Sequence, residues 1–326
     1  MKGRAHPMIA IDAIEAASQR LAGQASRTPL QHSQILSRTG AAVYLKLETR
    51  QATGSFKLRG ASNAVALLDN AARAAGLATA STGNHGRAVA QAARSHGARA
   101  IVCMSQLVPA NKVEAVAALG AQTRIVGRSQ DDAQREVDRL VREEGLTEIP
   151  PFDHADVIAG QGTIGLELIA DLPDVALVMV PLSGGGLASG VAAAVKALRP
   201  QTRVVGVSMV RGAAMQASLA AGRPVEVEEQ ETLADSLGGG IGLANRYTFA
   251  MCRDLLDEVI LLDEAQIAAG IRHAFLAEGE VVEGAGAVGI AALLAQKIVP
   301  HGPTAIIVSG RNIDEVRHRR IVAGDA

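Results

Sequence analysis

The chain has 326 residues, about twice the size of an ordinary single domain, so two domains or one large α/β unit is expected. Hydrophobic residues make up 48% and charged residues 20%, a globular balance that excludes an intrinsically disordered chain. The 32 Lys and Arg residues nearly balance the 33 Asp and Glu residues, and aromatic residues make up only 2%, which excludes nucleic-acid binding driven by charge or base stacking.

The two cysteines, Cys103 and Cys252, exclude a disulfide framework and a Cys-rich zinc site, and they fit a reducing, cytoplasmic compartment. No apolar segment precedes Asp12, so no secretory signal is expected. The uncharged segment 175–195 is long enough to span a membrane, but Pro181 and several glycines within it predict a buried strand, a turn and a helix. No membrane partner is therefore expected.

Short apolar runs alternate with longer helical patterns along most of the chain. Eight buried strands are predicted, at residues 43–47, 77–80, 100–104, 123–126, 175–180, 203–207, 259–262 and 305–308. Eight helices are predicted, at residues 55–69, 85–95, 110–119, 131–144, 160–170, 187–198, 264–278 and 287–295, with Ser55 and Asp263 as N-caps. Uniformly apolar strands between helices are typical of parallel sheets covered on both faces, so the predicted fold class is α/β.

Breaks in this pattern indicate the domain organisation. Pro150 and Pro151 interrupt it within segment 148–152, which is the best position for a domain boundary. The basic segment 317–320 is expected to be a solvated tail rather than a nucleic-acid site. Because ligands of open α/β sheets bind beyond the carboxyl ends of the strands, the functional residues are sought in the turns at strand ends.

The first unusual turn, residues 53–60, places Lys57 in the first turn of a predicted helix. The helix dipole disfavours an ammonium group at this position and lowers the pKa of the amine, which suits a Schiff base or a general base. Taken alone, Lys57 is more simply explained as an exposed surface lysine.

Three further turns complete the pattern. Residues 81–86 follow a strand and open a helix, so their N–H groups form a nest suited to a carboxylate; the alternative is an ordinary turn capped by Asn84. Residues 183–187 contain three consecutive glycines whose bare backbone suits a phosphate, without the features of a P-loop or a dinucleotide fingerprint. Ser309, after the last strand, offers a neutral hydroxyl to a ring nitrogen. Together with Lys57, these features are what pyridoxal phosphate holding an amino acid requires.

Over residues 27–312, the sequence resembles the fold type II pyridoxal-phosphate enzymes of the threonine/serine dehydratase and serine racemase group. The resemblance includes these turns and further motifs in the same order along the chain. The motifs lie at residues 27–30, 46–48, 54–60, 157–163, 232–235 and 283–286. The resemblance implies two open, twisted parallel-sheet domains of the tryptophan synthase β-like fold, with the cofactor in the cleft between them. It also implies a large domain from residues 1–50 and 146–326, a small mobile domain from residues 51–145, and a homodimer.

The resemblance implies a role for each matching residue. Lys57 would form the Schiff base with the cofactor and then remove the α-proton of the substrate, with Ser81 and Thr82 as further catalytic residues. The implied cofactor-binding residues are Phe56, Lys57, Asn84, Gly184, Gly185, Gly186, Leu187, Glu283 and Ser309. The implied substrate-binding residues are Ser81, Thr82, Gly83, Asn84, His85 and Arg311. The implied reaction eliminates water from a β-hydroxy amino acid, after which ammonia is lost and a 2-oxo acid remains.

Departures from the family pattern refine this expectation. Thr82 stands where racemases carry a serine base, and its stiff β-branched side chain disfavours efficient racemisation. Ser208, Gly212 and Ala214 replace the carboxylates of metal-activated relatives, so no metal site is expected. Arg311 replaces a glycine and is either an exposed side chain or a group that recognises an anion. The chain also ends without the regulatory extension of biosynthetic threonine deaminases, which suggests a catabolic enzyme.

Two segments narrow the choice of substrate. Residues 81–87 and 235–242 most resemble the corresponding segments of dehydratases of hydroxyectoine utilisation. They imply a β-hydroxylated diaminobutyrate as substrate. The alternatives are L-threonine or L-serine, which would give 2-oxobutanoate or pyruvate, and 3-hydroxyaspartate. Two other classes stay open: a β-replacement enzyme such as a cysteine synthase, which ammonia release without added thiol would exclude, and a nucleotide-binding protein without enzymatic activity, which copurified NAD would support.

Overall fold

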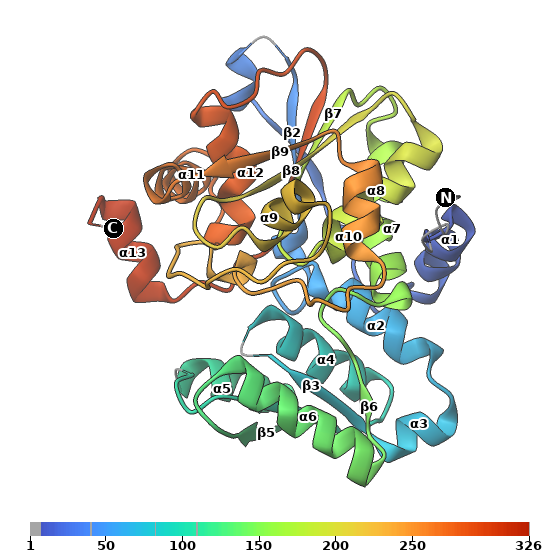
Figure 1. Cartoon of the computed structure of the whole chain (residues 1–326). Coiled ribbons are helices and arrows are strands. Elements are labelled where there is room, and N and C mark those ends of the chain that lie inside the picture. The colour runs from blue at the N-terminus through green and yellow to red at the C-terminus, as the bar shows by residue number, and fades with distance from the viewer. Residues whose placement is uncertain (1–7, 40, 82, 109, 326) are drawn as a thin grey trace.

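Two largely parallel sheets organise the chain in a computed structural model, which describes residues 8–39, 41–81, 83–108 and 110–325 (Figure 1). The strands are β1 (Leu30–Ser33), β2 (Val43–Leu47), β3 (Leu77–Ala80), β4 (Ala100–Met104), β5 (Gln122–Ile125), β6 (Thr147–Glu148), β7 (Leu177–Pro181), β8 (Arg203–Met209), β9 (Glu258–Leu262) and β10 (Thr304–Val308). The larger sheet has the order β1-β2-β10-β7-β8-β9, and the smaller sheet has the order β5-β4-β3-β6. All neighbouring pairs are parallel except β1 and β2.

Helices cover both faces of each sheet (Figure 1). They are α1 (Ile11–Arg20), α2 (Lys57–Leu67), α3 (Asn70–Ala75), α4 (Asn84–Ser95), α5 (Ala110–Ala117), α6 (Gln130–Glu144), α7 (Ala155–Asp171), α8 (Gly186–Leu198), α9 (Ala214–Ala221), α10 (Thr248–Leu255), α11 (Glu264–Leu276), α12 (Gly284–Leu294) and α13 (Glu315–Ala323). Three 3₁₀ turns are η1 (Leu36–Thr39), η2 (Glu48–Arg50) and η3 (Asp235–Leu237). Within the described part of the chain, none of these helices combines the length and the apolar character that a membrane crossing requires.

The apolar strands of the larger sheet contribute side chains to two hydrophobic cores, one on each face of the sheet. Along β10, Ile306 and Val308 pack under α11 and α12, whereas Ala305 and Ile307 pack under α7 and α8. Successive side chains of a strand point to opposite faces, so a strand buried on both sides must be apolar at every position. This explains why the strands appear as continuous apolar runs in the sequence.

The smaller sheet repeats this arrangement. Val102 and Met104 of β4 pack under α2, α4 and α5, while Ile101 and the free, buried Cys103 pack under α6. The two-residue strand β6 pairs with β3. It lies just after residue 145, where the small domain was expected to end, and the two prolines of segment 148–152 follow it after Ile149. Helix α2 packs against α4 on one side and α7 on the other, so it joins the two sheet units.

The predicted strands are all present, with bounds within two residues of the expectation. The predicted helices are also present, but α7 begins five residues early because its glycines provide close packing rather than a helix end. A Cβ on Gly160, for example, would lie 2.7 Å from the Arg59 carbonyl oxygen on α2. The basic segment 317–320 is not a tail, because it forms part of α13 and His318 is buried against Phe275; Arg319 and Arg320 are exposed, as expected.

The two predicted N-caps have different outcomes. Asp263 caps α11 and forms a reciprocal capping box with Gln266. Ser55 does not cap α2, because it pairs through its backbone with Gly310 after β10, and the N-cap position falls on Phe56 without a side-chain hydrogen bond. The start of α2 is therefore tied to the turn after β10 instead of being capped locally.

Candidate active site

The turns after β3, β7 and β10 meet at a cavity of about 1010 Å³ that is lined by residues from both sheet units. The predicted residues that line it are Phe56, Lys57, Ser81, Gly83, Asn84, His85, Gly184, Gly185, Gly186, Leu187, Glu283 and Ser309. Two predicted residues are not among them. Arg311 is exposed on the surface and does not line the cavity, so the structure agrees with its interpretation as a surface side chain. Thr82 lies outside the described residues.

Lys57 begins α2, and its amine points to the chain after β6. The Nζ atom donates a hydrogen bond of 2.6 Å to the carbonyl oxygen of Pro151 and lies 5.3 Å from the centre of the Phe56 ring. The pKa of this amine is lowered to about 8 by burial. The sequence had suggested the helix dipole as the cause instead. Roughly a tenth of the amine is therefore unprotonated at pH 7, and this form can act as a nucleophile and a proton acceptor.

The glycine loop after β7 requires glycine for steric reasons. Gly185 has a φ of +91°, and a Cβ on Gly186 would lie 2.9 Å from the Cα atom of Phe152. The loop opens the 13-residue helix α8, whose N-cap Gly185 provides no side-chain hydrogen bond and whose first turn contains no acidic residue. Bare amides at a helix N-terminus attract anions, so a phosphate group fits this end of the cavity.

The turn after β3 is arranged differently from the predicted carboxylate nest. The Ser81 hydroxyl oxygen accepts hydrogen bonds from the backbone N–H groups of Gly83 (3.3 Å) and Gly86 (3.1 Å). Ser81 therefore occupies two of the donors that were assigned to a substrate carboxylate. The backbone N–H groups of Asn84 and His85, at the start of α4, have no acceptor within the helix and stay suited to that carboxylate.

His85 is buried with one ring nitrogen paired. Its Nε2 atom lies 2.8 Å from the carbonyl oxygen of Ile149, and because a carbonyl can only accept, Nε2 carries the proton. Burial, together with the charge of Lys57, lowers the pKa of His85 to about 3, so the ring is neutral. The Nδ1 atom is then a bare acceptor, and it has no hydrogen-bond partner.

A buried carboxyl, Glu283, joins the two sheet units across the cavity. It accepts a hydrogen bond of 2.7 Å from Asn84 of α4 and one of 3.0 Å from the backbone N–H of Asn312, whose side chain in turn donates to Asn84. Burial, with a smaller contribution from Asp235, raises the pKa of Glu283 to about 7. The sequence analysis expects Asn84 to bind the cofactor. In this structure its side-chain amide donates a hydrogen bond to Glu283 instead.

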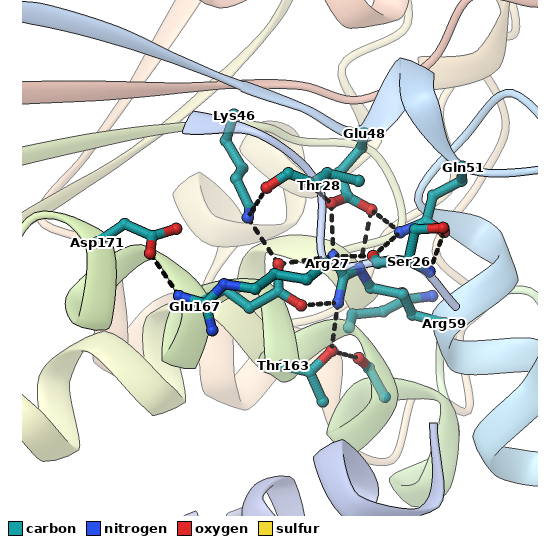
Figure 2. A network of polar contacts seen from close by, with 12 residues as sticks. Ser26, Arg27, Thr28, Lys46, Glu48, Gln51, Arg59, Thr163, Glu167 and Asp171 are labelled. Carbon is teal, nitrogen blue, oxygen red and sulfur yellow. Dashed lines mark hydrogen bonds and ion pairs between the residues drawn. The ribbon is translucent and has the colours of Figure 1, made fainter. Parts of the chain in front are cut away.

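A buried ion network surrounds Arg59, which lies two residues after Lys57 in the first turn of α2 (Figure 2). Arg59 donates two hydrogen bonds to Glu48 of η2 and two to Glu167 of α7, at 2.6–2.9 Å. Lys46 of β2 also pairs with Glu167 at 2.6 Å. Burial opposes ionisation of Glu48, but Arg59 holds its pKa below the usual value. The network ties the first turn of α2, which carries Lys57, to η2 and α7.

Sequence reasoning missed several residues at this site. Asn312 was seen only as part of a turn, and Asp131, Glu226 and Glu229, which line the cavity, were not assigned any role. Asn312 could have been found from its position after a strand end. The acidic residues lie on exposed segments without a motif, so only the tertiary structure brings them to the cavity.

Comparisons with known proteins agree with the expected family. A family model described as pyridoxal-phosphate dependent enzyme matches residues 21–310. A Sinorhizobium fredii protein, provisionally named a threonine dehydratase, is 59% identical over 97% of this chain and 96% of its own length. An L-threonine ammonia-lyase of Thermotoga maritima is 41% identical over 97% of this chain and 78% of its own. Among solved structures, maize serine racemase has a TM-score of 0.91 and 33% identity over 98% of both chains.

Proposed function

The chain belongs to the family of pyridoxal-phosphate-dependent enzymes, and from this membership we propose that it removes water and then ammonia from a β-hydroxy amino acid. Its α/β fold is the fold type II of these enzymes, and its homologues are threonine dehydratases and ammonia-lyases. One observation carries the proposal: the Lys57 amine shares a cavity with the bare amides of Gly184–Gly186 and the Ser309 hydroxyl.

The residues present fit pyridoxal phosphate. The Gly184–Gly186 amides would hold its phosphate, Phe56 would lie against the ring and Ser309 would bond the ring nitrogen. When bound, the cofactor supplies an aldehyde that links covalently to amines and a conjugated ring that stabilises negative charge at the substrate Cα. The Nζ atom of Lys57 would take up the α-proton. Ser309 is an uncharged hydroxyl, so it does not hold the ring nitrogen in its protonated form, which favours elimination over transamination.

The lowered pKa of Lys57 predicts the pH dependence of cofactor capture. Only the unprotonated amine attacks the aldehyde, and its fraction rises as the pH passes through the pKa of about 8. The rate at which cofactor-free protein captures pyridoxal phosphate, followed by absorbance, is expected to rise with a midpoint near pH 8. A midpoint near the ordinary lysine value of 10.5 would contradict a buried amine.

The glycine loop predicts a steric effect on cofactor affinity. In Gly186→Ala, the new Cβ would lie 2.9 Å from the Phe152 Cα, so the backbone that lines the phosphate position must shift. We expect pyridoxal phosphate to bind roughly 10-fold or more weakly in an absorbance titration, since small displacements weaken geometry-dependent binding. Gly240→Ala is the matched control, because Gly240 lines the same cavity and its Cβ would meet no atom closer than 3.9 Å. Equal affinities of the two variants would argue against the phosphate position.

For the substrate, we propose a β-hydroxylated diaminobutyrate derived from hydroxyectoine. The segment 235–242, whose pattern suggested this substrate, lines the cavity along its whole length. L-Threonine is the second candidate, and the names of the Thermotoga maritima and Escherichia coli relatives support it. The test is 2-oxo acid and ammonia formation from a panel of both substrates, L-serine and 3-hydroxyaspartate. No product from any of them would overturn the proposed activity.

We further propose that the small sheet unit, expected at residues 51–145, closes over the substrate, and that the enzyme is a cytoplasmic homodimer. The contacts between the units support closure: Asn84 and Arg87 of α4 bond Asn312, and Lys112 of α5 lies 3.6 Å from Asp235. Closing a site excludes water from the reaction. A lower radius of gyration with a substrate analogue bound, measured by small-angle scattering, would support this motion.

A further inference from the structure

The chain passes from the smaller sheet unit to the larger one along residues 149–153, between β6 and α7 (Figure 1). We call these residues the crossing segment. The smaller unit holds its first residue: the Ile149 N–H donates to the Ala78 carbonyl oxygen at 3.0 Å, and the Ile149 carbonyl oxygen accepts from the Thr79 hydroxyl at 3.0 Å. Its last three residues contact the candidate active site and the helix that supports it.

Two residues of the crossing segment touch the groups that would hold the cofactor. The Pro151 carbonyl oxygen accepts the hydrogen bond of 2.6 Å from the Lys57 amine. Phe152 packs against the glycine loop: a Cβ on Gly184 would lie 2.6 Å from its ring, and one on Gly186 would lie 2.9 Å from its Cα atom. A shift of the crossing segment would therefore displace both the partner of the amine and the contact that shapes the glycine loop.

The next residue, Asp153, anchors the crossing segment to the N-terminus of α10. Its Oδ2 atom accepts a hydrogen bond of 2.6 Å from the backbone N–H of Arg246. Its Oδ1 atom accepts from the N–H groups of Tyr247 and Thr248, both at 2.9 Å. The N-cap residue Tyr247 provides no side-chain hydrogen bond, so a carboxylate 94 residues earlier in the chain fills that role.

Helix α10 in turn packs beneath the same glycine loop. A Cβ on Gly185 would lie 2.9 Å from the Thr248 Cβ atom and 3.0 Å from the Cys252 Sγ atom. The hydroxyl of Ser189 on α8 lies 3.5 Å from the Thr248 carbonyl oxygen and 3.5 Å from Cys252 Sγ, and these three side chains are at most 1% exposed. The glycine loop therefore contacts both the crossing segment and α10, which Asp153 joins.

We propose that Asp153 is a positioning residue for the cofactor. Its carboxylate fixes the crossing segment to α10, and this link keeps the glycine loop in shape for the phosphate and the Pro151 carbonyl beside the Lys57 amine. Asp153 does not itself line the cavity, so it acts through these neighbours. The inference rests on the proposed function, because it takes the glycine loop as the phosphate position. The alternative is that Asp153 caps α10 and does nothing more.

The test is the rate at which Asp153→Ala holoenzyme releases pyridoxal phosphate after transfer to cofactor-free buffer, followed by absorbance. We expect release about 10-fold faster than from the wild type, because loss of a helix cap that also fixes a binding loop weakens the bound geometry. The ³¹P resonance of the bound cofactor is expected to shift, since the amides around the phosphate move. In Asp153→Asn, which keeps the shape and one acceptor oxygen, release is expected to be about threefold faster.

Asp263→Ala is the matched control. Asp263 is also a carboxylate at a helix N-terminus, where it accepts a hydrogen bond of 2.8 Å from the Gln266 N–H, but it is exposed and does not line the cavity. Both alanine variants are expected to unfold at lower urea concentration than the wild type. Only Asp153→Ala is expected to release the cofactor faster and to shift the ³¹P resonance. If an alanine variant does not fold, Asp153→Asn and Asp263→Asn are compared in its place.

Release at the wild-type rate with an unshifted ³¹P resonance in the Asp153 variants, or equal changes in the Asp153 and Asp263 variants, would overturn the inference. Its failure is distinguishable from failure of the proposed function. If the wild-type holoenzyme forms a 2-oxo acid and the Asp153 variants release the cofactor normally, the proposed activity stands and the inference falls. If no β-hydroxy amino acid yields a 2-oxo acid, the proposed activity fails, while the release rates still decide the role of Asp153.

Discussion

Replacing Lys57 with alanine is expected to lower the kcat for 2-oxo acid formation by at least about 10³-fold, the loss typical of removing a nucleophile that also transfers a proton. Lys57 lines the same cavity as the glycine loop and Ser309, and burial lowers the pKa of its amine to about 8. The other lysine among the described lining residues, Lys112, lies 3.6 Å from the carboxylate of Asp235. The measurement is the steady-state rate with the best substrate of the panel.

Lys112→Ala provides the control for this variant, because Lys112 lines the same cavity but its amine lies 3.6 Å from the carboxylate of Asp235. Its kcat is expected to stay within about 10-fold of the wild-type value. Circular dichroism of both variants would show that the fold is intact. A Lys57→Ala enzyme that keeps a tenth or more of the wild-type kcat would show that another group does the chemistry.

Replacing Arg59 with methionine is expected to lower the free energy of unfolding by about 3–5 kcal/mol, because removal of one partner leaves buried carboxylates without their cation. The Arg59 side chain is 2% exposed, and its partner Glu48 is 0% exposed. Methionine fills a similar volume, so the loss comes mainly from charge and hydrogen bonding. Urea denaturation of the cofactor-free proteins would measure it.

Arg139 on α6 is a suitable control for Arg59. It bonds the carboxylates of Glu136, Glu143 and Glu144, but its side chain is 35% exposed. Exposed ion pairs contribute little, so Arg139→Met is expected to lower the free energy of unfolding by less than about 1 kcal/mol. A similar decrease in the free energy of unfolding in both variants would show that burial does not make the Arg59 network more important for stability than an exposed one.

The sequence predicted the sheet strands well because most of the eight predicted strands are apolar on both faces; the edge strand β5, with Thr123 and Arg124, is an exception. The two missed strands lack this pattern: β1 has exposed residues at Gln31 and His32, and β6 has only two residues. Helix α13 was missed because its charged surface, with Arg317, Arg319 and Arg320, hides the buried contacts of His318 and Ile321. Such elements depend on tertiary contacts that no local pattern records.

The parts of the candidate site that could be predicted are those that depend on a short stretch of sequence at the end of a strand. The glycine loop, Lys57 and Ser309 each follow from a turn at a strand end, and the structure brings them to one cavity. Side-chain partners were not predictable, because they depend on which residues face one another. Asn84 binds Glu283, Ser81 binds the amides of its own turn, and Arg311 points to solvent.

The central claim is that Lys57 carries the cofactor, and borohydride reduction of the holoenzyme tests it most directly. Reduction fixes a lysine-bound pyridoxal phosphate to the chain, and peptide mass spectrometry then identifies the modified residue. We expect the added pyridoxyl phosphate mass on the peptide that contains Lys57 and on no other. An unmodified Lys57, or a stoichiometric modification at another lysine, would contradict the account.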